Sequence, residues 1–132
     1  MDIRFFVDEN YGERLVTGLR DLGYDNIEHL LENFDRATPD EEWLEYIGER
    51  GYVLITRDKM IRRRPNEKAA LIRHKIVAFY LIGNSTGTKE ISKQLIIAWD
   101  RMEGRAKRQK KKGIAGAFNV NRRGKITEIP LT

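Results

Sequence analysis

The chain has 132 residues, enough for one domain with its own hydrophobic core and too few for a multidomain enzyme. It contains no cysteine, which excludes a disulfide scaffold, a cysteine-ligated zinc site and a thiol nucleophile. The longest apolar run, residues 76–82, is too short to span a bilayer, and the N-terminus has no signal-peptide pattern. We therefore expect a soluble, cytoplasmic protein that does not enter a membrane.

Charge is divided unevenly along the chain. Residues 1–56 hold 14 acidic and 5 basic residues, a balance of −9, whereas residues 57–132 hold 6 acidic and 20 basic residues, a balance of +14. A metal-dependent enzyme acting on a polyanion needs both kinds of group, because carboxylates bind divalent cations and lysine and arginine bind phosphates. Solvated helix faces and a basic tail would give the same numbers, so the positions of the charges must decide.

Strand and helix patterns alternate from the start. Residues 3–7 are apolar and rich in strand formers, which predicts a buried strand with Asp8 at its carboxyl end. Asn10 and Glu13 resemble a capping box, and the apolar spacing after them predicts a helix. A second, shorter strand is expected within residues 24–31, after a glycine that ends the helix.

The next helix has a clear start signal. Thr38 as N-cap and Pro39 at the first helical position predict a helix that continues to Gly51. Residues 52–56 then predict a third strand, and Asp58 follows its carboxyl end.

Further elements continue the alternation. A helix is expected over residues 65–73, a buried strand over residues 75–82, and a helix whose apolar face runs over residues 91–102. Strands alternating with helices through short connections favour a mostly parallel sheet with helices on both faces. The predicted fold class is therefore α/β, a three-layer α/β/α sandwich.

The C-terminal part is basic and then strand-like. Residues 105–112 hold six bases in eight positions, and three interpretations stay open: a contact with RNA, a contact with an acidic partner, or a disordered arm. Residues 115–120 and 125–129 predict two short strands around a turn, forming a hairpin or an edge addition to the sheet.

Carboxylates follow the predicted strands. In an open parallel sheet, ligands bind outside the carboxyl ends of the strands, where Asp8, with Glu9 beside it, and Asp58 are expected. Asp40 is harder to place, since it begins a helix that leads into the third strand. Converging carboxylates repel one another unless a hard cation neutralises them, so this pattern indicates a Mg²⁺ or Mn²⁺ site that hydrolyses phosphodiesters. Taken singly, Asp40 could be a helix-start residue, Asp58 a turn residue and Glu9 a solvated one.

The joint spacing resembles a known family. Residues 40–58 resemble the stretch of PIN-domain nucleases in which an acid opens a helix, a glycine closes it, and a strand ends in Thr-x-Asp, here Thr56 and Asp58. The opening Phe-Phe-Val-Asp-Glu-Asn of residues 5–10 is similar to the PIN-like branch with an Asp-Glu-Asn signature, related to VapC-type toxins. Together these segments cover about the first half of the chain.

This resemblance implies a single PIN-like domain over residues 1–132 with a short C-terminal β extension. It implies an endoribonuclease dependent on Mg²⁺ (or Mn²⁺), commonly the toxin of a type II toxin–antitoxin pair, with RNA as substrate and an antitoxin or a second copy as possible partners. The residues carried over as catalytic are Asp8, Asp40, Asp58 and Thr56, of which the three aspartates, with Glu9, would bind the metal. The mid-chain glutamate of the fuller pattern has no clear counterpart, and Glu9 or Glu41 would have to replace it.

Other side chains fit the same scheme. Five bases surround Asp58 in the sequence: Arg57, Lys59, Arg62, Arg63 and Arg64. They would clamp RNA phosphates or, alternatively, form a solvated loop. His29 and His74 are expected to be structural or exposed. Tyr11, Trp43 and Trp99 are expected on apolar helix faces, in the core.

Two other functions remain open from the sequence. A receiver-like signalling domain also places acids after its first strand and a phosphoacceptor aspartate after its third, although no lysine follows a fifth strand here. A catalytically inactive PIN-like module that binds RNA or a protein partner would explain the missing glutamate.

Overall fold

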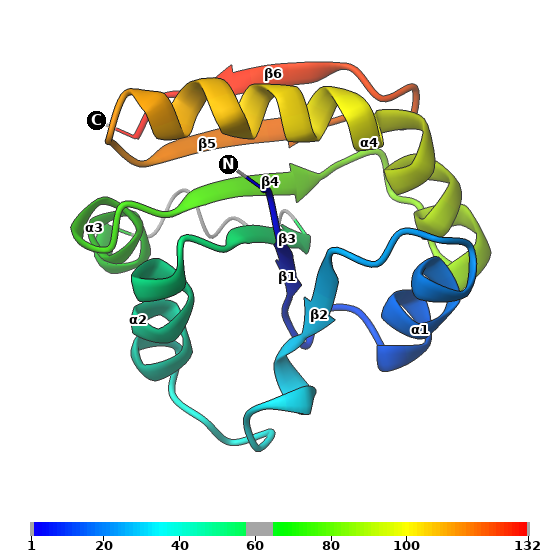
Figure 1. The fold of residues 1–132 in the computed structure, drawn as a ribbon, viewed down its shortest axis with the longest axis horizontal. Helices are drawn as coiled ribbons and strands as arrows, with labels where there is room; N and C mark the ends of the chain where they lie inside the picture. Colours follow the sequence, from blue (N-terminus) through cyan, green and yellow to red (C-terminus); the bar gives the residue numbers. More distant parts are fainter. Residues whose placement is uncertain (1, 58–64, 132) are drawn as a thin grey trace.

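The computed structural model describes residues 2–57 and 65–131 of the chain (Figure 1). In chain order the elements are β1 (Phe5–Val7), α1 (Glu13–Asp21), β2 (Ile27–His29), the short 3₁₀ helix η1 (Leu30–Glu32), α2 (Asp40–Arg50), β3 (Val53–Arg57), α3 (Pro65–Arg73), β4 (Val77–Leu81), α4 (Gly87–Lys111), β5 (Gly116–Val120) and β6 (Ile126–Ile129). The alternation expected from the sequence is confirmed, including the short second strand.

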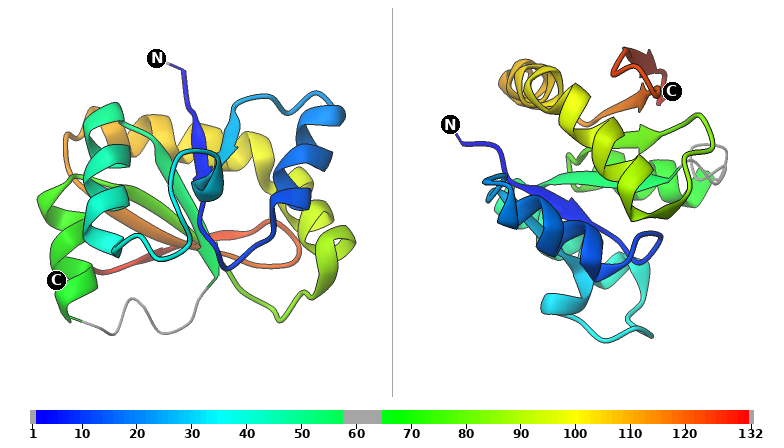
Figure 2. Two further views of the ribbon diagram at one scale, coloured as in Figure 1. Left: turned by 90° about the horizontal axis from the view of Figure 1, so that it is seen from below. Right: turned by 90° about the vertical axis from the view of Figure 1, so that its right-hand side faces the viewer.

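The strands form one sheet in the order β2-β1-β3-β4-β5-β6. All neighbours pair in parallel except β5 and β6, which are antiparallel. Helices α1 and α4 cover one face, and α2 and α3 cover the other (Figures 1 and 2). The predicted three-layer α/β fold is therefore confirmed. The C-terminal hairpin is also confirmed, and its first strand extends the parallel sheet because it pairs with β4.

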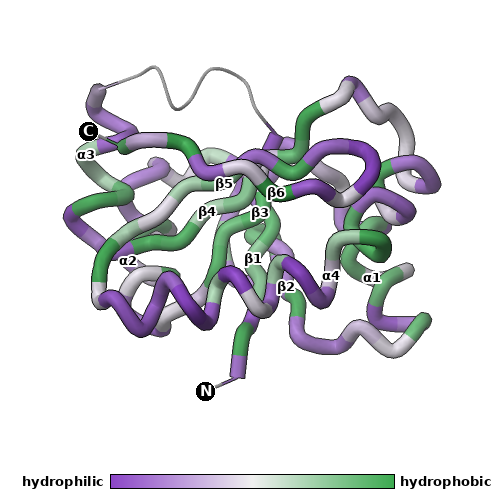
Figure 3. Tube along the Cα trace, turned by 90° about the horizontal axis from the view of Figure 1, so that it is seen from above, coloured by the Kyte–Doolittle hydropathy of each residue, from purple (hydrophilic) through white to green (hydrophobic). Residues whose placement is uncertain are grey.

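The sheet is buried between the two helix layers. Phe5 and Phe6 on β1 are fully buried and point to opposite faces, as neighbours on a strand must. Phe5 contacts Trp99 of α4 edge-on with 4.9 Å between ring centroids, and Phe6 stacks on Trp43 of α2 at 5.8 Å. Both tryptophans are core residues, as expected, and Figure 3 shows the hydrophobic strands in the middle of the molecule.

Two predicted helix caps are wrong. The N-cap of α1 is Gly12, without a side-chain cap, because the side chain of Asn10 is hydrogen-bonded to Asp8 and Thr56 instead. The N-cap of α2 is Pro39, one residue later than expected, and it has no side-chain cap either. Both helices still start within a few residues of the predicted positions, since the apolar spacing that defines them is unchanged.

The basic run is helical, so the alternative of a disordered arm is wrong. Helix α4 has 25 residues and continues through residues 105–111. Alanine, lysine, arginine and glutamine are good helix formers, and bases near a helix C-terminus interact favourably with the helix dipole. Met102 and Ala106, four positions apart, are fully buried and continue the apolar stripe into the basic run.

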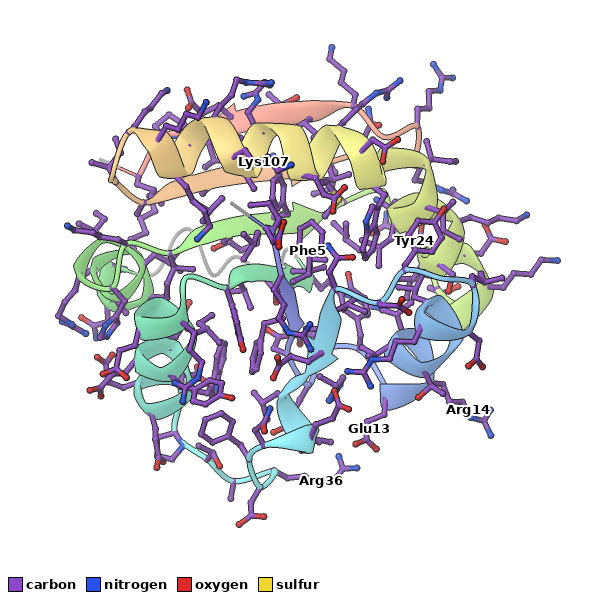
Figure 4. The ribbon with its side chains drawn as sticks, viewed as in Figure 1. Phe5, Glu13, Arg14, Tyr24, Arg36 and Lys107 are labelled. Atoms are coloured by element: carbon purple, nitrogen blue, oxygen red, sulfur yellow. The ribbon has the colours of Figure 1, made fainter. Side chains whose placement is uncertain are left out.

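The basic end of α4 lies at the amino ends of the parallel strands. Helix α4 starts after the carboxyl end of β4 and leads to the amino end of β5, and near its C-terminus Lys110 donates to the carbonyl of Gly51, just before β3. Lys107 on α4 and Arg36, in the loop before α2, lie on opposite sides of the view in Figure 4. Over the described ranges, no helix combines the length and apolar character needed to cross a bilayer.

Candidate functional site

The strand order reverses direction at β1, which places a ligand site between β1 and β3. Strand β2 lies on one side of β1, and the next strand in the chain, β3, lies on the other side of β1. Ligands in such sheets bind where the order reverses, outside the carboxyl ends of the strands. A cavity of about 350 Å³ lies there. We call it the acidic cleft, after the carboxylates that line it among the described residues: Asp8, Glu9, Asp40 and Glu67.

Asp8 lies at the end of β1 and is held by three hydrogen bonds. One carboxylate oxygen, Oδ1, accepts from the backbone N–H of Asn10 at 3.1 Å. The other, Oδ2, accepts from the Asn10 side-chain amide at 3.2 Å and from the Thr56 hydroxyl at 2.6 Å. Thr56 lies on β3 and is fully buried, and Asn10 also donates to its hydroxyl at 3.0 Å. Asn10 and Thr56 therefore fix the orientation of the Asp8 carboxylate.

The electrostatics of Asp8 favour a cation in the cleft. Burial raises the pKa of Asp8 above its ordinary value, and the negative charge of Asp40 raises it further, while the hydrogen bonds from Thr56 and Asn10 lower it. Asp8 is only 5% exposed. A carboxylate kept out of water and next to a second carboxylate is stabilised by a bound positive charge.

Asp40 lines the cleft from the first turn of α2, where its Oδ1 accepts from the Trp43 indole at 3.2 Å. Its placement was left open from the sequence, and topology explains it. A crossover helix runs antiparallel to the strands it joins, so the start of α2 lies at the carboxyl ends.

The same argument applies to a residue that the sequence analysis missed. Glu67 is in the first turn of α3, which precedes β4, and it lines the cleft beside Asp40. Glu41, by contrast, does not line the cleft. It accepts hydrogen bonds from His74 and Arg73, all at 2.8 Å, which hold its pKa below the ordinary value. Glu9 lines the cleft and Glu41 does not, which leaves Glu9 and Glu67 as the further carboxylates there.

Five of the predicted site residues lie outside the described residues: Asp58, Lys59, Arg62, Arg63 and Arg64. Arg57 is described. It lines the acidic cleft, and its guanidinium lies 5.1 Å from the centre of the Tyr11 ring. Within residues 2–57 and 65–131, no three acidic or histidine side chains are close enough together to hold one metal ion. Mg²⁺ commonly uses one or two carboxylates and keeps several waters, so the oxygen donors of Asp8 and Asp40 fit this kind of ion.

The two histidines have structural contacts, as expected. His29 is 1% exposed; its Nε2 lies 2.7 Å from the Tyr11 carbonyl and its Nδ1 accepts from the backbone of Leu31 at 3.0 Å. These contacts connect the turn after β1 to the end of β2. His74 pairs with Glu41. Tyr11 is buried as expected, in the turn between β1 and α1 instead of on a helix.

Comparison with known proteins gives one match. A family model described as "PIN like domain" matches residues 3–83, which is more than half of the chain and runs from β1 through β4. Searches of curated proteins and of solved structures gave no significant match. The matched range contains every residue that lines the acidic cleft, and PIN-like domains are generally nucleases. The chain therefore belongs to the PIN-like domain family.

Proposed function

We propose that this chain is an endoribonuclease that hydrolyses RNA phosphodiester bonds with Mg²⁺ or Mn²⁺. The observation that carries the proposal is the pair of Asp8 and Asp40 in one cleft, at the reversal point of a PIN-like sheet. Asp8 is the stronger indicator, since it is buried, oriented by two neighbours and close to a second negative charge.

Each residue has a defined part in this proposal. A bound divalent cation would lower the pKa of a water molecule and neutralise the phosphate. Asp8 and Asp40 would hold that ion, with Asp58 as a third ligand by family resemblance and Glu9 or Glu67 as further acids. Thr56 and Asn10 fix the Asp8 carboxylate in one position. Arg57, on the wall of the cleft, would bind a phosphate oxygen through its planar guanidinium, and Lys59, Arg62, Arg63 and Arg64 would bind neighbouring phosphates.

We further assign the chain to the VapC-type toxin branch, as the toxin of a type II toxin–antitoxin pair. The Asp-Glu-Asn signature at residues 8–10 supports this assignment, because all three side chains line the cleft and Asn10 supports the first acid. An antitoxin protein and a second copy of the chain are then its expected partners.

A catalytically inactive PIN-like module is the second candidate. It is favoured by one observation: the described part of the chain brings no three metal-binding side chains together. Such a module would bind RNA through Arg57 and the basic segment after it without cutting the strand.

Cleavage of a mixed pool of single-stranded and structured RNA by the purified protein tests the proposal. Cleavage in Mg²⁺ or Mn²⁺ should disappear with EDTA and with Asp8→Asn, and it should persist in Asp21→Asn, an exposed aspartate on α1 that serves as the matched control. Undiminished cleavage by Asp8→Asn would refute the assignment of the site. RNA binding without cleavage would support the inactive module, and phosphorylation by acetyl phosphate would support a receiver-like domain.

Thermal unfolding with Mn²⁺ gives a readout that does not depend on cleavage. A ligand at about 100 times its dissociation constant stabilises the folded state by about 2.7 kcal/mol. Mn²⁺ should therefore raise the melting temperature of the wild type and of Asp21→Asn, and should have a much smaller effect on Asp8→Asn.

A further inference from the structure

A second cavity lies beside the acidic cleft, between the carboxyl end of β4 and the first turns of α4. Its volume is about 260 Å³. We call it the α4 pocket. Residues that matter for its chemistry are Tyr11, Arg57, Ser85, Ile91 and Gln94, which all line it. Arg57 lines both cavities, so the α4 pocket is next to the proposed catalytic site.

One residue that lines the α4 pocket has a buried acceptor with no donor in the described part of the chain. Gln94 is 2% exposed, and its Nε2 donates to the carbonyl of Ile82 at 2.8 Å and to that of Val120 at 2.9 Å. Two carbonyl partners fix the orientation of the amide, because only its nitrogen can donate to them. The Oε1 atom is buried and has no hydrogen-bond partner among the residues that the structure describes. Buried polar atoms are almost always paired, so Gln94 Oε1 requires a donor, either from a water molecule or from a ligand in the pocket.

Ser85, which also lines the pocket, has a second buried polar atom. Within the described ranges, Ser85 Oγ is also buried without a partner. The lining of the pocket also includes the apolar residues Leu81 and Ile91 and the aromatic Tyr11. Burial raises the pKa of Tyr11 to about 12, against a hydrogen bond from Arg57 that lowers it, so its hydroxyl is neutral at physiological pH. The pocket therefore suits a group that combines apolar surface with hydrogen-bond donors, as a nucleobase does.

The mouth of the α4 pocket favours a negative charge. Helix α4 begins at Gly87, and its N-cap, Thr86, makes no side-chain cap hydrogen bond; the acid in its first turn, Glu90, lies 3.6 Å from the guanidinium of Arg122. The first N–H groups of a long helix attract anions, and phosphate is a common ligand there. Gly87 has φ +77° and open space where a Cβ would stand, so a ligand can approach its backbone. The guanidinium of Arg57 adds a positive charge on the side facing the acidic cleft.

We infer that the α4 pocket binds one nucleotide of a single-stranded RNA substrate, next to the phosphodiester that is cut. The base lies against Tyr11 and Ile91 and donates to Gln94 Oε1 and Ser85 Oγ, and the phosphate lies at the first turn of α4 near Arg57. This inference rests on the proposed ribonuclease function. An inorganic anion alone would not use the free acceptor, and a purely apolar ligand would use neither the acceptor nor the helix N-terminus.

Titration of the isotope-labelled full chain with nucleoside 5′-monophosphates, followed by NMR in EDTA, tests this inference. The adenosine, cytidine, guanosine and uridine forms are compared, with ribose 5-phosphate as a ligand that has a phosphate and no base. At least one nucleotide should shift the Gln94 side-chain amide and the backbone amides of residues 85–88. Ribose 5-phosphate should bind about tenfold more weakly, since it lacks the contacts of the base.

Ser85→Ala provides the matching variant. Loss of one buried hydrogen bond should weaken nucleotide binding by about fivefold to tenfold. Ser92→Ala, a serine on α4 that does not line the pocket, should bind as the wild type does. Gln94 itself is left intact because its two hydrogen bonds connect α4 to the strand ends.

Three results would overturn the inference: no shift at Gln94 up to about 10 mM nucleotide, equal binding of ribose 5-phosphate, or unchanged binding by Ser85→Ala. The titration involves no cleavage, so it separates the two proposals. A protein that cuts RNA but fails the titration has no nucleotide subsite here. A protein that passes the titration but does not cut RNA retains the subsite and contradicts the nuclease proposal.

Discussion

The hydrogen bond from Thr56 to Asp8 can be tested by its effect on stability. Thr56→Val replaces the hydroxyl by a methyl group of similar size, so the packing of this fully buried residue is nearly preserved. The Asp8 carboxylate then loses a donor at 2.6 Å and stays buried. Hydrogen bonds to charged groups contribute about 1.5–3 kcal/mol, and this range is the expected loss in the free energy of unfolding.

This loss is large enough to measure by thermal denaturation. With about 2.1 cal/mol/K of unfolding entropy per residue, a chain of 132 residues loses roughly 4 °C of melting temperature per kcal/mol. Thr56→Val should therefore melt about 5–11 °C below the wild type in metal-free buffer. Thr56→Ser keeps the hydroxyl and removes only a buried methyl group, so it should lose about 1 kcal/mol.

A double-mutant cycle with Asp8→Asn tests whether the loss of stability in Thr56→Val comes from the hydrogen bond to Asp8. Without the negative charge, the Thr56 hydroxyl makes at most a neutral hydrogen bond, and Thr56→Val should then lose only about 0.5–1.5 kcal/mol. The coupling between the two positions should be about 1–2 kcal/mol. If Thr56→Val is equally destabilising in both backgrounds, Thr56 does not stabilise a charged Asp8, and its proposed positioning role is wrong.

Two further predictions concern the rest of the fold. A Cβ at Gly48 would lie 2.7 Å from His74 Cβ and 2.9 Å from its carbonyl oxygen, so Gly48→Ala must separate α2 from the end of α3 and should lose about 1–3 kcal/mol of stability. Gly18→Ala is the control: a Cβ there would have nothing within 4 Å, so this variant should gain about 0.5–1 kcal/mol. Equal melting temperatures of the two variants would contradict this packing. The hydrogen bond from Arg20 holds the pKa of Glu32 below its ordinary value. The ionised Glu32 side chain therefore stabilises the folded state above pH 4.5, and this stabilisation is lost as the pH falls through the lower pKa of the folded state. Urea unfolding should show Glu32→Gln less stable than wild type at pH 7, with a difference that shrinks toward pH 3; a constant difference would contradict the assignment to charge.

The fold could be predicted from the sequence because its signals are local. Apolar spacing and glycine stops define each element, and the left-handed Gly51 that ends α2 is one such stop. One error, the N-cap of α1, arose where a side chain had two possible partners. Asn10 has the spacing of a helix cap, but the buried carboxylate of Asp8 and the hydroxyl of Thr56 take its amide, and this competition depends on two strands meeting in space.

The site was harder to predict because its acids come from elements that are far apart in the sequence. Glu67 and Asp40 lie on different helices, and both reach the cleft because each helix crosses antiparallel to the strands. That rule was available from the predicted strand–helix order and would have placed both acids. The pairing of Glu41 with Arg73 and His74 could not be predicted from the sequence, because it depends on how α2 packs against α3.

Among the described carboxylates of the cleft, Asp8 is the one that most requires a functional explanation. Acids in a first helical turn are stabilised by the helix dipole, and α1, α2, α3 and α4 each have at least one there, including Asp40 and Glu67. These acids would be expected in a protein with no metal at all. Asp8 lies at the end of a strand, away from any helix start, and is buried at a net electrostatic disadvantage that raises its pKa. The basic end of α4 lies at the amino ends of the strands, whereas Asp8 lies at a carboxyl end, so the bases of α4 do not offset this disadvantage. A bound cation at Asp8 is the simplest explanation of why a carboxylate is held there.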